Sequence, residues 1–212
     1  MEFELRPWRM EDAETIARYA NNPKIAANLR DAFPHPYTQR DAETFIQSCL
    51  DADPARCCFR AIAVNGETVG SISLSIGEDI SSKSAELGYW LAEPYWGQGI
   101  MPEAVRQICG FAFQTYGLAR IFAVPFAYNL ASRRVLEKAG FQQEGLMRNS
   151  VYKRGMLYDS YLYARTSQDG PAHDPDRTDR EEHASGRLQM RSACLHRVFV
   201  NIFKAERQIG FL

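Results

Sequence analysis

The segment at residues 85–104 carries the residue types best suited to chemistry in this chain. It reads AELGYWLAEPYWGQGIMPEA, a strand-like stretch that passes through a glycine turn into the start of a helix. Gly97 and Gly99 flank Gln98, and Pro102 stands in the first helical turn. N–H groups of that turn have no partner within the helix, so the N–H that proline lacks costs no hydrogen bond. Such a turn directs several backbone N–H groups to one point at the positive end of the helix dipole. The pattern therefore predicts an anion site that suits a phosphate group.

The hydrophobic pattern predicts the elements that must position this turn. Residues 58–64 and 68–76 alternate like two strands around Asn65-Gly66, a strong two-residue hairpin signal. Asn129 and Gly140 stand where the cap and the C′ residue of a helix belong. We expect further strands at residues 3–8, 81–91, 120–124, 142–147 and 156–165, and helices at residues 11–20, 24–29, after Thr38, 102–116 and 130–139. This order predicts an α/β or α+β domain with a mixed sheet.

Composition and charge restrict the class of protein. Of 212 residues, 45% are hydrophobic and 24% are charged, as in an ordinary soluble globular protein. A net charge of −1 gives no support for nucleic acid or an anionic membrane surface as a partner. No apolar run is long enough to cross a bilayer, and the first residues lack a signal-peptide pattern. Five cysteines without CxxC spacing favour neither disulfides nor a metal site, so we expect a cytoplasmic protein.

A second motif lies downstream, at residues 129–141, which read NLASRRVLEKAGF. Together with the sequence YWGQGIMPEA between a strand and a helix, it resembles the GCN5-related N-acetyltransferase (GNAT) superfamily. Within it, the chain resembles the ribosomal-protein alanine N-acetyltransferases, through LRPW at residues 5–8, ELGYWL at residues 86–91 and the ending at residues 148–161. The resemblance covers about residues 1–165. It implies a mixed, mostly antiparallel central sheet with a splayed central strand pair and flanking helices.

The resemblance also implies where the cosubstrate acetyl-CoA binds. It would lie between the strands at residues 86–91 and 120–124, and its pantetheine amides would pair with the backbone of Leu91 and Ala92. Its pyrophosphate would bind the backbone of the turn, which comprises Trp96, Gly97, Gln98, Gly99, Ile100 and Met101. Trp96 replaces the Gln or Arg usual in the superfamily, and Met101 replaces the usual Gly or Ala. A methionine side chain can point away while its N–H still serves the phosphate.

Acetyl transfer to an amine needs a base, because a primary amine is mostly protonated at neutral pH. The resemblance points to Glu86, on the strand that leads to the turn; the alternative is a surface glutamate paired across the sheet. Asn129 and Ser132 would face the thioester end. Asn129 can serve there and also cap the helix, whereas Ser132 either protonates the leaving thiolate or only hydrogen-bonds locally. The tyrosine acid that many members carry in the helix after this Asn has no counterpart here.

The expected function is direct acetyl transfer from acetyl-CoA to a primary amine, with the α-amine of a protein N-terminus as the favoured acceptor. A small-molecule enzyme acting on polyamine- or aminoglycoside-type amines is an alternative, because the fold does not determine the acceptor. A non-catalytic CoA-binding module is another, although the joint presence of Glu86, Asn129 and Ser132 argues against it. We expect no nucleic acid, membrane or metal partner, and a homodimer remains open.

The composition of the chain changes after residue 166. We expect the acetyltransferase domain at residues 1–166 and a polar linker at residues 167–186, which has no aliphatic or aromatic residue other than alanine. Residues 187–212 regain apolar residues at the spacing of an amphipathic helix. This extension could be a partner-docking helix, a dimer arm or a tail without a role.

Overall fold

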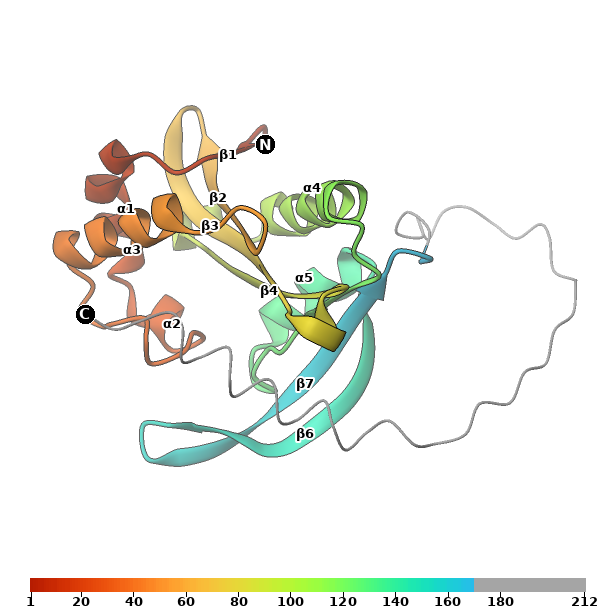
Figure 1. Ribbon diagram of the computed structural model, residues 1–212. Helices are drawn as coiled ribbons and strands as arrows, with labels where there is room; N and C mark the ends of the chain where they lie inside the picture. Colours follow the sequence, from red (N-terminus) through yellow and green to blue (C-terminus); the bar gives the residue numbers. More distant parts are fainter. Residues whose placement is uncertain (170–212) are drawn as a thin grey trace, which may run out of the picture. The chain divides into compact units, whose positions relative to one another are not determined.

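The computed structural model describes residues 1–169, which contain one seven-stranded sheet (Figure 1). The strand order is β1-β2-β3-β4-β5-β7-β6, and neighbours run antiparallel except β4 and β5, which are parallel. The predicted mixed, mostly antiparallel sheet is confirmed. The predicted extension at residues 187–212, and the predicted linker from residue 170 onward, lie outside the described residues. The strands are β1 (Glu4–Arg6), β2 (Cys57–Val64), β3 (Glu67–Ile76), β4 (Ser84–Leu91), β5 (Arg120–Ala123), β6 (Gln142–Lys153) and β7 (Met156–Thr166).

Some of the helices begin at a residue whose side chain accepts from a free N–H group of the first turn. The Thr38 hydroxyl accepts from the N–H of Asp41, whose carboxylate accepts from the N–H of Thr38 at 2.8 Å, which completes a capping box. The Asn22 side chain caps α2 by accepting from the N–H of Lys24 at 2.9 Å. None of the described helices is long and apolar enough to span a membrane. The helices are α1 (Ala13–Ala20), α2 (Pro23–Ala26), α3 (Gln39–Asp51), α4 (Ile100–Thr115) and α5 (Leu130–Lys138).

Helices cover both faces of the sheet (Figure 1). Adjacent residues of β2 show this, because Ile62 packs in a core with α4 and α5, whereas Ala61 packs in a second core with α1 and α3. Side chains alternate in the same way along β4. Leu87 belongs to the core with α4 and α5, and Trp90 packs against the core with α1 and α3. Glu86 therefore faces the α1 and α3 side of the sheet.

The parallel pair β4 and β5 opens in the middle of the sheet. Only three residue pairs join the two strands, from Ser84 opposite Arg120 to Glu86 opposite Phe122. Beyond Glu86, β4 continues to Leu91 along β3 alone. The splayed central strand pair implied by the sequence resemblance is thus present, and it opens at the residue predicted to act as the base.

The hairpin of β6 and β7 is longer than predicted, because β6 extends from the predicted residues 142–147 to Lys153. Between the pairs Met147–Ser160 and Val151–Tyr158, β6 advances four residues while β7 advances two. This bulge breaks the alternation on which the sequence prediction rested. Its centre is Asn149, which has φ +50° and donates its N–H to the Asp159 carboxylate at 2.7 Å.

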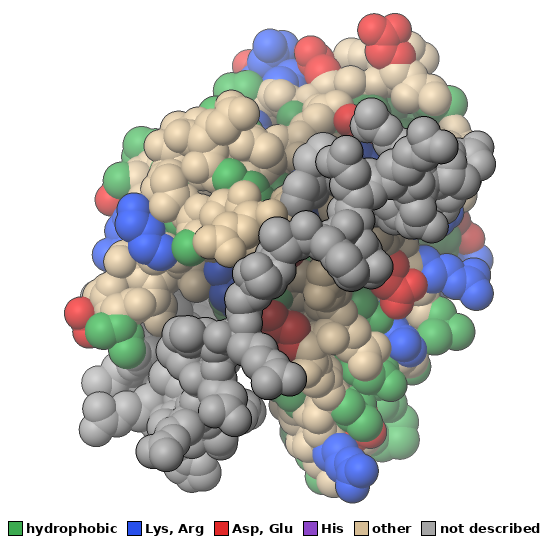
Figure 2. Space-filling view, turned by 90° about the vertical axis from the view of Figure 1, so that its right-hand side faces the viewer, with side chains coloured by type: hydrophobic (Ala, Val, Ile, Leu, Met, Phe, Trp, Pro, Cys, Tyr) green, Lys and Arg blue, Asp and Glu red, His purple; other side chains and the backbone are tan. Residues whose placement is uncertain are grey.

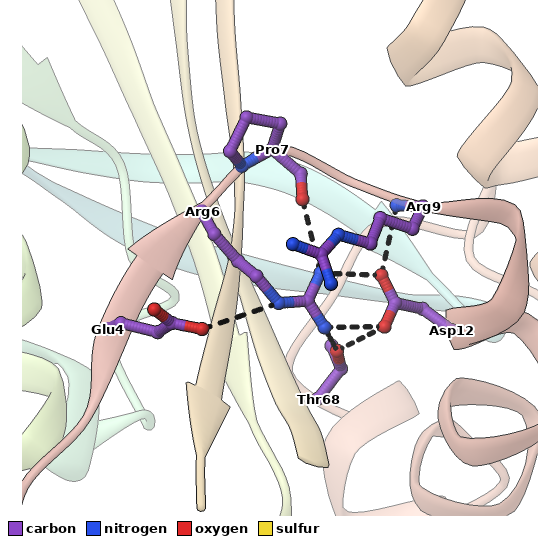
Figure 3. Close-up of polar contacts among 6 residues, drawn as sticks. All are labelled: Glu4, Arg6, Pro7, Arg9, Asp12 and Thr68. Atoms are coloured by element: carbon purple, nitrogen blue, oxygen red, sulfur yellow. Dashed lines mark hydrogen bonds and ion pairs between the residues drawn. The ribbon is translucent and has the colours of Figure 1, made fainter. Parts of the chain in front are cut away.

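A buried ion pair joins the first strand to the rest of the sheet (Figure 3). Two nitrogens of Arg6 donate to the two carboxylate oxygens of Asp12 at 2.8 and 2.6 Å. Thr68 on β3 also donates to Asp12 at 2.6 Å, and the N–H of Arg9 donates at 3.0 Å. Burial opposes ionisation of Asp12, but these donors outweigh it and hold its pKa below the ordinary value. The charge of Asp12 therefore contributes to stability.

Candidate active site

The glycine turn at the start of α4 presents a cluster of unused hydrogen-bond donors. Gly97 and Gly99 have φ of +74° and +78°, the left-handed region that glycine adopts without strain. Within residues 1–169, no hydrogen bond uses the N–H groups of residues 97–101. A Cβ added to either glycine would meet no atom of residues 1–169 within 4 Å, so the described chain leaves the space beside both glycines open. Five free donors at a helix N-terminus fit an anion such as a pyrophosphate.

The side chains of the turn hold its shape and leave the donors clear. Ile100 and Met101 are buried in the core with α4 and α5, so the Met101 side chain points away from the open space as expected. The Trp96 indole N–H donates to the carbonyl of Leu91 at 2.7 Å. The Gln98 amide donates to the carbonyl of Pro94 at 2.8 Å. Both bonds tie the turn back to the segment that precedes it.

The backbone at the end of β4 is less available than predicted. Ala92 donates its N–H to Val69 on β3 at 2.8 Å, and its carbonyl accepts from Tyr95. Ala92 therefore has no free N–H to offer a pantetheine amide, and its carbonyl has one lone pair left to accept, so its place in the cosubstrate site stays a prediction. Backbone groups alternate between the two sides of an antiparallel strand, so the N–H of Leu91 points away from β3 toward the opened side. Leu91 remains a candidate donor to the cosubstrate.

Glu86 lies at the point where β4 and β5 separate, on the α1 and α3 side of the sheet. Its side chain is 30% exposed. One carboxylate oxygen, Oε1, accepts from Arg30 at 2.5 Å. Glu86 is therefore ion-paired, as the alternative expected, but its partner Arg30 follows α2 and is not part of the sheet. A half-buried carboxylate at this junction can accept a proton from an amine that approaches the same face.

Asn129 and Ser132 form a second group at the N-terminus of α5. The Asn129 side-chain oxygen accepts from the N–H of Ser132 at 3.0 Å, so Asn129 is the helix cap that the sequence predicted. The Ser132 hydroxyl shares a hydrogen bond of 2.8 Å with the hydroxyl of Tyr89 on β4. Burial raises the pKa of the Tyr89 phenol, which stays protonated at neutral pH.

Tyr89 is a candidate site residue that the sequence analysis missed. Its position in ELGYWL gave a signal, because strand alternation places it on the same face as Leu87 and Leu91, toward α5. The prediction for an acid considered Ser132 and a tyrosine in the helix after Asn129, but no tyrosine on a strand. The structure supplies a tyrosine from β4 instead, within hydrogen-bond distance of Ser132.

The two groups lie on opposite faces of β4. Glu86 faces α1 and α3, whereas Tyr89 and Ser132 meet on the side of α5. Among the described residues, no hydrogen bond links Glu86 to Asn129 or Ser132. An amine and a thioester that approach from the two faces would meet where β4 and β5 separate, which is a suitable arrangement for direct transfer between two bound substrates.

Nucleophilic cysteine and metal chemistry find little support in the described part of the chain. Burial raises the pKa of the Cys109 thiol to about 12, and its side chain packs in the core with α4 and α5. Residues 1–169 contain no group of three or more His, Cys, Asp or Glu side chains arranged to hold a metal ion. Where grey atoms do not cover it, the face seen in Figure 2 mixes acidic, basic and hydrophobic side chains.

Comparisons with known proteins agree with this geometry. Residues 2–142 match the family model described as "Acetyltransferase (GNAT) domain". The Bacillus subtilis (strain 168) protein named "Probable N-acetyltransferase YjcK" is 36% identical over 176 residues, which cover 78% of this chain and 94% of that protein. The ribosomal-protein-serine acetyltransferase of Escherichia coli (strain K12) is 33% identical over 99 residues, 47% of this chain and 55% of that protein.

A solved structure extends the likeness to three dimensions. RimL, a ribosomal L7/L12 α-N-protein acetyltransferase in complex with coenzyme A, superposes with a TM-score of 0.69 at 25% identity. The match covers 77% of this chain and 93% of RimL. The family match, the opened strand pair and the free donors at α4 point to the same chemistry. The chain belongs to the GNAT acetyltransferase family and is an acetyl-CoA-dependent N-acetyltransferase.

Proposed function

We propose that this enzyme transfers the acetyl group of acetyl-CoA directly to the α-amine of a protein N-terminus. The observation that carries the proposal is the set of five unused N–H groups at residues 97–101, beside a parallel strand pair that opens at Glu86. These donors would hold the pyrophosphate. The opened edge of β4, including the N–H of Leu91, would direct the rest of the cosubstrate toward Ser132.

The chemistry divides between the two faces of β4. Glu86 would accept a proton from the acceptor ammonium, directly or through a water molecule. The free amine then attacks the thioester carbonyl, and the tetrahedral intermediate collapses with loss of the CoA thiolate. The attacking nitrogen gives up its second proton as the amide forms. Ser132 either takes up this proton while it passes its own to the thiolate, or only donates a hydrogen bond to the thiolate while water takes the nitrogen's proton. Tyr89 fixes the Ser132 hydroxyl through their 2.8 Å hydrogen bond. Burial raises the pKa of the Tyr89 phenol, so it stays protonated and can keep this hydrogen bond to Ser132.

Two considerations favour an α-amine as the acceptor. The E. coli relative and RimL both carry names that describe ribosomal-protein acetylation. An α-amine also has an ordinary pKa near 7.7–8.0, whereas that of a lysine amine is about 10.4. Its free base is therefore far more abundant at neutral pH, which reduces the demand on a carboxylate base. Small primary amines such as polyamines share the higher pKa of alkylamines and are the second class to test.

The test combines binding and turnover. We expect isothermal titration calorimetry to detect acetyl-CoA binding, and we expect CoA release with peptides that carry a free N-terminus but not with the same peptides acetylated at the N-terminus. Polyamines and aminoglycosides serve as the competing acceptors. Turnover only with small amines would contradict the choice of acceptor. Binding without turnover of any amine would support the non-catalytic alternative, and no binding at millimolar acetyl-CoA would contradict the proposal altogether.

A further inference from the structure

Residues 27–31, between α2 and the loop that leads to α3, are held by three distant parts of the chain. The Tyr128 hydroxyl donates to the carbonyl of Ala27 at 2.7 Å. The Lys153 ammonium, at the end of β6, donates to the carbonyl of Leu29 and to the Asp31 carboxylate, both at 2.7 Å. Arg30 lies between these two attachments and contacts Glu86 at 2.5 Å. We call residues 27–31 the tethered segment.

Lys153 is an unusual residue for the tip of a hairpin. It is only 5% exposed, whereas its neighbour Tyr152 is 71% exposed and Met156 is 57% exposed. A buried ammonium needs partners that compensate for its lost hydration. Both partners of Lys153 belong to the tethered segment and lie more than 120 residues away in the sequence. The long β6–β7 hairpin, which reaches toward α2 in Figure 1, thus serves to bring this cation to the segment.

The attachments of Lys153 flank Arg30 on both sides. Because Leu29 and Asp31 are fixed, the backbone of Arg30 has little freedom, even though its side chain is 66% exposed. Arg30 binds Oε1 of Glu86, and no hydrogen bond of the described residues uses Oε2. An exposed ion pair of this kind adds little to stability. Stability therefore does not explain why Arg30 is held on the candidate base.

We propose that Lys153 and Arg30 are positioning residues for acetyl transfer. Lys153 fixes the tethered segment, the segment holds Arg30 on Oε1 of Glu86, and the carboxylate is thereby oriented with Oε2 directed to the acceptor amine. This inference rests on the proposed function, because it assigns Glu86 as the base. A base is effective only in the correct geometry, and a misplacement of about 1 Å can reduce a rate by about 100-fold.

The test compares two arginines in matched ion pairs. Arg30→Gln removes the partner of Glu86, and Arg18→Gln removes an arginine of 64% exposure that pairs with Glu67 on β3. Steady-state kinetics with an acceptor peptide should show kcat reduced by about 10- to 100-fold in Arg30→Gln, with an unchanged KM for acetyl-CoA. Arg18→Gln should retain the wild-type kcat. Equal kcat values in the two variants would overturn the inference.

Lys153→Met tests the rest of the chain of contacts. Its kcat should fall like that of Arg30→Gln, and the double variant should be no slower than the slower single variant, because both act through one carboxylate. Asp31→Asn, which keeps the Lys153 bond to Leu29, should lose less activity and covers the case that Lys153→Met fails to fold. Additive effects on kcat would overturn the inference.

The proposed function and this inference fail differently. An active wild type whose Arg30→Gln and Lys153→Met variants keep full activity contradicts only the positioning roles. An active wild type whose Glu86→Gln variant also keeps full activity contradicts the base assignment, and the positioning roles with it. A wild type inactive on every amine overturns both proposals.

Discussion

Replacement of Gly99 by alanine tests the anion turn most directly. Gly99 has φ +78°, a conformation that costs a residue with a Cβ about 1–2 kcal/mol. The added Cβ would meet no protein atom within 4 Å, so the fold can accept it at that cost. We place the pyrophosphate against the free N–H groups of this same turn, and we expect the added Cβ to keep it from approaching them closely. Stability and cosubstrate affinity should therefore both fall.

Gly66→Ala is the matched control for this substitution. Gly66 has φ +82°, has no atom within 4 Å of an added Cβ, and lies in the turn between β2 and β3. Both variants should lose about 1–2 kcal/mol of unfolding free energy, a fall in Tm of about 2–8 °C for a chain of this size. Only Gly99→Ala should also lose a hydrogen bond to a charged group, about 1.5–3 kcal/mol. That loss corresponds to a Kd about 10- to 150-fold higher.

The assay is isothermal titration of acetyl-CoA into both variants and the wild type, with thermal unfolding measured in parallel. Gly66→Ala should bind like the wild type despite its lower Tm, which separates affinity from stability. Similar affinity in all three proteins would refute the assignment of the turn to the pyrophosphate. Similar weakening in both glycine variants would show that the loss of affinity follows general destabilisation.

Three further outcomes follow from the contacts of the candidate site and the N-terminal strand. Glu86→Gln should lower kcat by about 10²- to 10⁴-fold with an unchanged Kd for acetyl-CoA, and a wild-type rate would remove Glu86 from the base role. Tyr89→Phe loses a hydrogen bond of about 0.5–1.5 kcal/mol to Ser132 and should slow kcat by up to about tenfold; additive effects with Ser132→Ala would contradict action through Ser132. Asp12→Asn leaves the buried Arg6 with only the exposed Glu4, 3.6 Å away, as a counter-charge and should cost about 3–5 kcal/mol of unfolding free energy at neutral pH. Because the pKa of Asp12 is lower in the folded than in the unfolded protein, the stability that Asp12 contributes is present above its unfolded pKa and is lost as pH falls through its folded pKa. The unfolding free energies of wild type and Asp12→Asn, measured by denaturant titration, should therefore converge at acidic pH. A difference that stays constant with pH would contradict this assignment.

Much of the candidate site could be predicted from the sequence, because its signals are local. The glycines at residues 97 and 99, the cap at Asn129 and the hairpin at Asn65-Gly66 each depend on the φ preference or the side-chain oxygen of a single residue. Such preferences act over a few residues and are therefore visible in the linear sequence. The strand pattern up to Ala123 was predictable for the same reason, since alternation of apolar residues follows from burial of one face.

The tertiary structure decided which of these residues meet and which do not. Tyr89 reaches Ser132 across 43 positions of sequence, Arg30 reaches Glu86 across 56, and Lys153 reaches Leu29 across 124. Strand register also decided that Ala92 donates its N–H to Val69 and that Glu86 and Ser132 lie on opposite faces of β4. These contacts depend on how distant elements pack, which no local preference encodes. The sequence by itself therefore determined the chemistry available to this protein, and only the packing of the sheet and its hairpin decided how those groups are oriented toward each other.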